Sequence, residues 1–122
     1  LRNRFHVLKL YGAQVIRPVL NVELRSDHAR RQIRRLRKWL TREDLQLSTR
    51  QRKTLDAALR ESNKLEIVIE FKRRLKALMQ PSVKDAERLA RLQEWGAKAE
   101  ATGIEALNEF AMRLRGYSMH AT

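Results

Sequence analysis

The stretch that decides the fold is Lys64–Met79, KLEIVIEFKRRLKALM, in which apolar residues recur every three or four positions. This spacing places side chains on one face of an α-helix, and it continues for about four turns. The β-branched run Ile67-Val68-Ile69 would also suit a strand. The length of the pattern and the helix-forming residues on both sides favour the helix, although charged Lys72 interrupts its apolar face.

Similar apolar spacing predicts further helices on both sides of this one, over residues 1–24, 27–40, 48–59, 82–101 and 104–117. The 122 residues include only 4 glycines and 2 prolines, which argues against an all-β fold, and no cysteine, which excludes a disulfide scaffold. We therefore predict an all-α fold: a bundle of five to six amphipathic helices, mostly antiparallel, forming a single domain over residues 1–122.

The first helix is expected to be long, with Pro18 kinking it or ending it near Arg17. Its predicted apolar stripe consists of Phe5, Leu8, Val15, Val19 and Val22, and Gly12 on the same stripe would let another backbone approach closely.

Local signals predict where several helices begin and end. Ser48 and Gln51 have the spacing of a capping box, and Ser82 with Asp85 has a similar spacing. Ser26 and Asp27 are expected to cap the second helix, and Gly103 is expected to end the fifth.

The charge is large and uneven. The chain carries 27 Lys+Arg against 14 Asp+Glu, a net charge of +13. Residues 1–61 hold 16 basic and 6 acidic residues and residues 62–122 hold 11 and 8, so the net charges are +10 and +3. The densest cluster lies on the second predicted helix and consists of Arg30, Arg31, Arg34, Arg35, Arg37 and Lys38.

A helix this basic attracts polyanions such as nucleic acid, anionic lipid headgroups or a phosphorylated ligand, and these six residues are the predicted binding residues. The alternative is a solvated face that only aids solubility. The sequence disfavours nucleic acid, because Trp39 is the one aromatic residue among the charges and no helix-turn-helix signature follows.

The sequence offers no catalytic, cofactor-binding or metal-binding residue. His6, His28 and His120 are far apart and lack metal-ligand spacing. The pairs Glu66/Glu70 and Glu105/Glu109 have i, i+4 spacing but no histidine beside them, so solvent-facing positions are expected. No nucleophile or phosphate-binding motif is present.

Two stretches together resemble a known family. They are Asn3-Arg4-Phe5, Tyr11, Val15-Ile16, Pro18-Val19-Leu20 and Glu23-Leu24, and then Trp95, Ala99-Glu100, Thr102-Gly103-Ile104, Leu107, Phe110-Ala111, Leu114 and Tyr117. The chain resembles the C-terminal cytoplasmic region of bacterial membrane-bound delta-9 fatty acid desaturases. The ending alone also looks like the tail of certain insertion-sequence transposases, and the opening stretch favours the desaturase.

The resemblance implies a parent oxidoreductase that introduces a cis double bond into acyl chains, with O₂ and a di-iron centre held by histidine boxes. None of those boxes is present here, so this piece is expected to be non-catalytic and to lack its N-terminal membrane part. Its expected place is the cytoplasmic face of the inner membrane. The expected partners are the membrane surface, the membrane catalytic domain and an electron-transfer protein, with an acyl-CoA or acyl-lipid substrate left open.

Two other hypotheses stay open. One is a nucleic-acid-associated helical domain of a transposase-like protein. The other is a bundle that forms a homodimer through the first helix, where the stripe with Gly12 would accept a partner helix.

Overall fold

The computed structural model describes residues 4–26, 28–42 and 45–120, with the backbone alone for residues 4–5 and 117–120. All regular structure within these ranges is helical, which confirms the all-α prediction. The elements are α1 (Arg4–Tyr11), η1 (Gly12–Ile16), α2 (Arg17–Glu23), α3 (Arg30–Thr41), α4 (Thr49–Arg60), α5 (Asn63–Leu78), α6 (Asp85–Ala101) and α7 (Glu105–His120).

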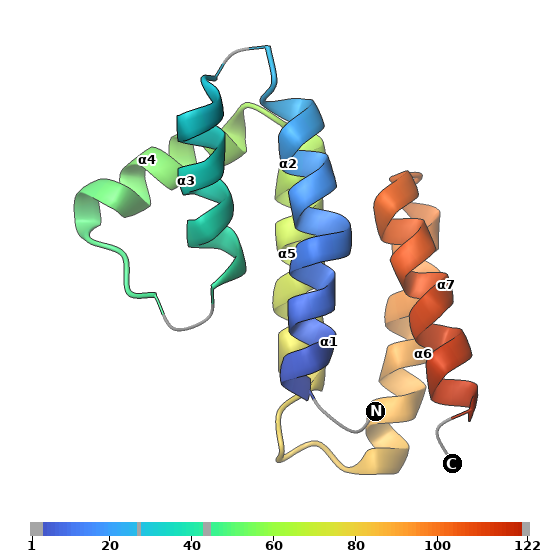
Figure 1. Cartoon of the computed structure of the whole chain (residues 1–122). Coiled ribbons are helices and arrows are strands. Elements are labelled where there is room, and N and C mark those ends of the chain that lie inside the picture. Colours follow the sequence, from blue (N-terminus) through green and yellow to red (C-terminus); the bar gives the residue numbers. More distant parts are fainter. Residues whose placement is uncertain (1–3, 27, 43–44, 121–122) are drawn as a thin grey trace.

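The molecule has a central pair of rods with a helical pair on each side (Figure 1). One rod is the continuous run of α1, η1 and α2, and the other is α5, which packs antiparallel against it. Helices α3 and α4 lie on one side, and α6 with α7 form an antiparallel hairpin on the other (Figure 1). The predicted helix at Lys64–Met79 is therefore the centre of the fold, where its apolar face meets several elements.

The first helix passes through Pro18 without ending there, because a π turn, η1, ends two residues before the proline. The Arg17 N–H donates to the carbonyl of Gly12, five residues back, in place of the usual four. Proline lacks the N–H of an ordinary helical turn and crowds the carbonyl four residues earlier. The wider turn accommodates this defect, as π-bulges commonly do. The prediction of a long first helix is correct, and its distortion lies at residues 12–16.

The π turn also changes which residues face inward. From its last residue onward, Ile16, Leu20 and Leu24 are almost fully buried, whereas Val22 is 68% exposed. The prediction that Val22 belongs to the apolar stripe is therefore wrong, because the stripe assumed regular 3.6-residue turns throughout. The side chain of Phe5 lies outside the described part of the structure.

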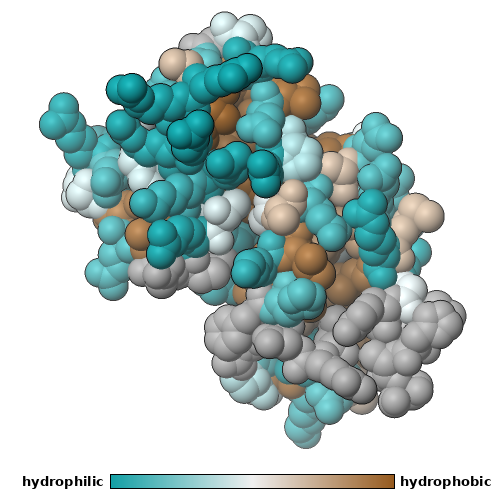
Figure 2. Space-filling view, in the orientation of Figure 1, coloured by the Kyte–Doolittle hydropathy of each residue, from teal (hydrophilic) through white to brown (hydrophobic). Residues whose placement is uncertain are grey.

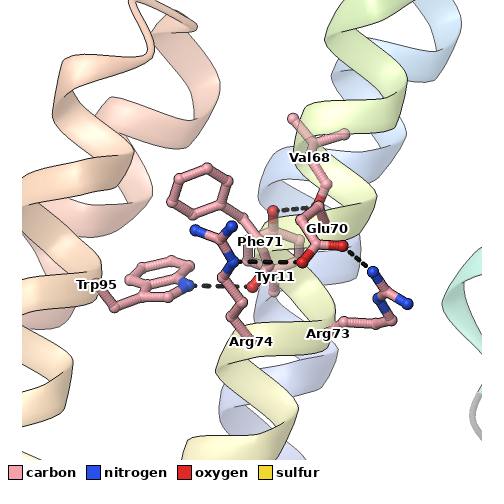
Figure 3. Close-up of polar contacts among 7 residues, drawn as sticks. All are labelled: Tyr11, Val68, Glu70, Phe71, Arg73, Arg74 and Trp95. Atoms are coloured by element: carbon pink, nitrogen blue, oxygen red, sulfur yellow. Dashed lines mark hydrogen bonds and ion pairs between the residues drawn. The ribbon is translucent and has the colours of Figure 1, made fainter.

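Aromatic side chains tie the hairpin to the central rods (Figure 3). The Tyr11 hydroxyl donates to the Val68 carbonyl at 2.5 Å, and Trp95 Nε1 donates to the Phe71 carbonyl at 3.0 Å. Tyr11 and Phe110 meet edge to face, with ring centroids 5.1 Å apart. Burial raises the pKa of the Tyr11 hydroxyl, so it remains the donor. These two hydrogen bonds thus satisfy buried polar side chains by joining α1 to α5 and α5 to α6.

The helix ends follow local signals only in part. The capping box is present, since Gln51 N–H donates to Ser48 Oγ at 3.1 Å and Ser48 N–H to Gln51 Oε1 at 2.9 Å. Gly103 adopts φ +74, the left-handed conformation expected after a helix. Helices α3 and α6 begin after Ala29 and Lys84 without a side-chain cap. The predicted caps at Ser26 and Ser82 are therefore wrong, and Asp27 lies outside the described residues.

Gly12 makes the close approach expected of it, within its own chain. A Cβ at Gly12 would lie 3.2 Å from Thr41 Cγ2 of α3. The stripe around it is buried by α3, α5 and α7. The first helix thus has its partners already, and the interpretation of this stripe as a homodimer interface is wrong.

Candidate functional site

Helix α3 is fixed to the bundle by a narrow apolar edge. Ile33, Leu36 and Leu40 are buried and recur at helical spacing, as the sequence predicted. They pack toward η1 and α2. The opposite side of the helix is therefore held facing the solvent.

That outward side carries the predicted basic residues. Arg30, Arg31, Arg34, Arg35 and Lys38 are exposed and Arg37 is half-buried. Arg31, Arg34, Arg35 and Lys38 follow i, i+3/i+4, i+7 spacing, so they form a band along the helix. We call all six the α3 basic face. Figure 2 shows hydrophilic side chains gathered over this part of the molecule.

The α3 basic face is not balanced by acids of the described structure. None of its six side chains forms an ion pair with a carboxylate in the described ranges. Like charges at i, i+4 repel one another, so the arrangement destabilises the helix slightly. A charge cluster of this kind attracts counterions or a polyanion.

Much of the α3 basic face borders one open hollow. Its lining consists of Arg31, Arg34, Arg35, Arg37, Lys38, Thr41 and Arg42. Thr41 Oγ1 donates to the Arg37 carbonyl at 2.7 Å and so belongs to the helix end. Arg30, the remaining member of the predicted cluster, does not line this hollow. Several arginine and lysine side chains at this hollow are thus placed to contact the same anionic ligand.

Helix α4 adds cations that the sequence analysis did not single out. Arg50, Arg52, Lys53 and Arg60 are exposed and form no ion pair with a described carboxylate. These four residues contribute to the excess positive charge of residues 1–61, but they lie farther apart along the chain than the basic residues of α3. The basic surface therefore covers two helices.

The histidines and paired carboxylates do not form a metal site in the described structure. Within these ranges no three His, Asp or Glu side chains come together in a way that could hold a metal. His28 Nε2 lies 2.7 Å from Glu61 Oε2, which joins the α2–α3 connection to the end of α4. The side chain of His120 is outside the described part.

The carboxylates examined for metal binding have ordinary partners. Glu70 accepts hydrogen bonds from Arg73 and, at 3.3 Å, from Arg74 Nε (Figure 3). The Arg73 bond lowers the pKa of the Glu70 carboxyl below its ordinary value. Glu109 pairs with Arg113 at 3.6 Å, and Glu66 and Glu105 are exposed. Helix surfaces commonly carry such i, i+4 pairs.

The described helices are all too short or too polar to cross a bilayer.

A search of known proteins finds a transposase that resembles this chain over most of its length. The chain is 36% identical over 117 residues to the transposase for insertion sequence element IS1001 of Bordetella parapertussis. The match covers 93% of this chain and 29% of the relative, so the chain spans less than a third of that protein's length. No solved structure matches the chain.

A family model gives the same assignment. The ISL3-type DDE model, described as transposase, matches residues 2–120. The desaturase resemblance is therefore wrong, and with it the expected role in lipid metabolism, the membrane partners and the place at the inner membrane. The expectation that nucleic acid is an unlikely partner is also wrong, and the transposase-like alternative is favoured. The chain belongs to the ISL3-type DDE transposase family.

Proposed function

We propose that this chain is a DNA-binding helical part of a transposase and that the whole protein is an enzyme that moves an insertion sequence element. The α3 basic face carries this proposal, because six cations on one helix have no carboxylate partner in the described structure. The name of the IS1001 relative supports the choice of DNA among the possible polyanions.

The chemistry of the face indicates contacts to the phosphate backbone. Arginine and lysine suit phosphate oxygens, and each phosphate that they neutralise releases counterions from the DNA. The 12-residue α3 is roughly 18 Å long, enough to run along several phosphates. Backbone contacts position a protein on the duplex and carry little sequence information. Binding by this surface should therefore depend strongly on salt and weakly on sequence.

The test compares two triple variants of equal charge change. Arg31→Gln/Arg34→Gln/Arg35→Gln removes three cations of the α3 basic face. Arg91→Gln/Lys98→Gln/Arg113→Gln removes three cations that are paired with carboxylates on α6 and α7. Fluorescence anisotropy with a labelled duplex of about 20 base pairs, roughly two helical turns, gives the affinity at several salt concentrations.

We expect the α3 variant to bind on the order of 100-fold more weakly at about 100 mM salt, with a salt slope lower by up to about 3. The hairpin variant should stay within about threefold of the parent chain. Equal losses in both variants would show that net charge alone is responsible. Absence of salt-dependent binding by the parent chain would remove the proposal altogether.

A further inference from the structure

The outward side of helix α2 carries an unusual set of exposed side chains. Arg17, Pro18, Asn21 and Val22 are all exposed and form two i, i+4 pairs, so they make one patch on the helix surface. Val22 is the most exposed of the large apolar side chains in the described part of the chain. We call these four residues the α2 outer face.

The π turn η1 directs this face outward. It places an extra residue in one turn, and each residue advances a helix by about 100°, so the side chains beyond it are rotated relative to a regular helix. Leu20 is buried and Val22 lies in the solvent as a result. The bundle therefore gains no packing from the apolar side chain of Val22. Such turns are frequent at functional sites.

The polar members of the α2 outer face do not hold the fold together. The Arg17 guanidinium and the Asn21 carboxamide form no hydrogen bond or ion pair with any described residue. The carboxylate of Glu23, the nearest acid in the sequence, is half-buried and accepts a hydrogen bond from Ser62 Oγ at 2.5 Å. The hydrogen-bonding groups of Arg17 and Asn21 are thus available to a ligand.

The α2 outer face lies beside the α3 basic face. Helix α3 packs against η1 and α2, and its Thr41 lies close to Gly12. Arg30, Arg34, Arg37 and Thr41 follow one another at steps of four, three and four residues, so these arginines lie on the side of α3 that borders the rod. The hairpin meets the rod at η1 and leaves the outward side of α2 open (Figure 1).

The composition of the α2 outer face matches what the edges of bases require. In the major groove, arginine forms paired hydrogen bonds with guanine, asparagine forms them with adenine, and apolar side chains contact the methyl group of thymine. Arg17 and Asn21 are separated by roughly 6 Å along the helix, which corresponds to about two base pairs. The face is therefore spaced to reach neighbouring base pairs.

The dimensions of α2 and α3 also suit a duplex. The major groove is about 12 Å wide and admits one α-helix. The axes of packed helices lie about 8–10 Å apart, so a groove that holds α2 would bring the phosphates of one edge to α3. The two faces would then contact bases and phosphates at the same time.

We propose that the α2 outer face enters the major groove of DNA and reads base edges, with Asn21 on an adenine and Val22 on the methyl group of a thymine. This inference rests on the proposed function and goes further, because the phosphate contacts of the α3 basic face carry little sequence information. The chain then prefers certain short sequences in addition to binding DNA in general.

The experiment begins with a selection of duplexes by the parent chain. The duplexes carry a randomised segment of about one helical turn, roughly 10 base pairs. Fluorescence anisotropy then compares the enriched duplex with a shuffled duplex of the same composition. We expect the enriched duplex to bind about 10–100-fold more tightly, since each base pair that is read well contributes roughly tenfold.

Four alanine variants locate the preference. Asn21→Ala should lose about tenfold of it and Val22→Ala about threefold, and both should bind the shuffled duplex within about twofold of the parent chain. Gln93→Ala and Met112→Ala change exposed side chains of the hairpin and should keep the full preference. Alanine favours helices, so all four should fold, which circular dichroism and a thermal melt check.

Changes in the DNA identify the two contacts directly. Uracil in place of thymine removes only the methyl group, and 7-deazaadenine in place of adenine removes the N7 acceptor. At one position, uracil should weaken binding of the parent chain about threefold and leave Val22→Ala unaffected. At another, 7-deazaadenine should weaken the parent chain and leave Asn21→Ala unaffected. A purely structural role of either residue would not produce this pairing.

Each result has a defined meaning. A preference that is lost in the two α2 variants and kept in the two hairpin variants supports base reading by α2. A preference that survives in both α2 variants, or that falls equally in all four, overturns it. If duplexes bind with strong salt dependence and no sequence is enriched, the α2 assignment fails and the proposed function stands. If no duplex binds, both fail.

Discussion

Helix α3 and the α6–α7 hairpin use charge in opposite ways. The α3 basic face holds six cations without a carboxylate partner in the described structure. Each cation described on the hairpin pairs with a carboxylate: Arg88–Asp85, Arg91–Glu87, Lys98–Glu94, Arg113–Glu109 and Arg115–Glu100. Charges of the hairpin support its helices, whereas those of α3 repel one another. Of these two regions, only α3 carries cations that lack a carboxylate partner within the described residues.

The two regions also differ in how firmly they are anchored. Helix α3 buries Ile33, Leu36 and Leu40 along one narrow edge. The hairpin buries a much larger set: Leu92, Trp95, Ala99, Ile104, Leu107, Phe110, Ala111 and Leu114. Because buried apolar area sets most of the stability, the hairpin should carry more of it than α3 does. The comparison predicts that stability and DNA binding can be altered separately.

The largest expected effect comes from Trp95→Ala in the hairpin. The change removes a buried ring, its contacts with Tyr11 and Phe110, and its hydrogen bond to the Phe71 carbonyl. We expect the free energy of unfolding to fall by about 4 kcal/mol, measured by urea denaturation. DNA affinity measured where the variant is still folded should remain close to that of the parent chain.

A matched control lies on the same helix. Leu89 is 44% exposed, so Leu89→Ala should change the free energy of unfolding by less than about 0.5 kcal/mol. If Trp95→Ala costs no more than Leu89→Ala, the hairpin is not anchored as described. If it also abolishes DNA binding by the folded protein, the two regions are coupled.

A smaller effect is expected from Arg88→Ala at the turn that leads into the hairpin. Arg88 donates to the carbonyls of Leu78, Gln80 and Val83 at 3.0, 2.9 and 2.9 Å, and its side chain is only 18% exposed. Its loss leaves these carbonyls without that donor, so we expect a cost of about 2 kcal/mol in urea denaturation.

The control for this change is Arg91→Ala, since Arg91 contacts Glu87 on the surface of the same helix. Exposed pairs contribute little, and we expect a cost of less than about 0.5 kcal/mol. Similar costs for the two variants would show that the backbone contacts of Arg88 do not hold the turn.

Arg88 also explains why one sequence rule failed. The Ser82 and Asp85 spacing predicted a cap, but helix α6 begins after Lys84 without one. Arg88, which follows in sequence, instead organises the turn by reaching back to carbonyls of residues 78–83. Capping rules consider only three or four neighbouring residues, so they cannot detect this arrangement. The rule succeeded at Ser48, where both bonds are local.

Periodicity predicted the fold well and the inward face of the first helix less well. The helix at α5 and the buried edge of α3 follow regular spacing, and both were predicted. The π turn before Pro18 adds a residue to one turn, which a pattern of 3.6 residues cannot represent. Val22 was placed inside for this reason.

The α3 basic face was predicted from charge alone, whereas the hollow lined by Trp39, Leu55 and Ile69 was not. This hollow combines residues from α3, α4, α5 and a connection, and only the tertiary fold brings them together. The desaturase resemblance failed because the opening stretch was given more weight than the ending. The ending, which includes Leu107, Phe110 and Leu114 of α7, also resembled insertion-sequence transposases, the family that the comparisons show.

The smallest expected effect is a gain in stability on loss of a cation, and it tests the comparison between α3 and the hairpin most directly. Arg34 lies three or four positions from Arg30, Arg31, Arg37 and Lys38, all of them basic. Each such like-charged pair destabilises a helix by a few tenths of a kcal/mol, and Gln has a helix propensity similar to that of Arg. Arg34→Gln should therefore raise the free energy of unfolding by about 0.5–1 kcal/mol at low ionic strength. The gain should vanish at about 1 M salt because the repulsion is screened.

The matched change in the hairpin should have the opposite sign. Lys98→Gln removes the pair with Glu94 and should lower the free energy of unfolding by about 0.3 kcal/mol under the same low-salt conditions. If both changes destabilise, the α3 charges are already compensated within the chain, and the proposal that they bind DNA loses its physical basis. If Arg34→Gln stabilises the fold and weakens DNA binding, the cation lowers stability and serves binding, as residues of functional surfaces often do.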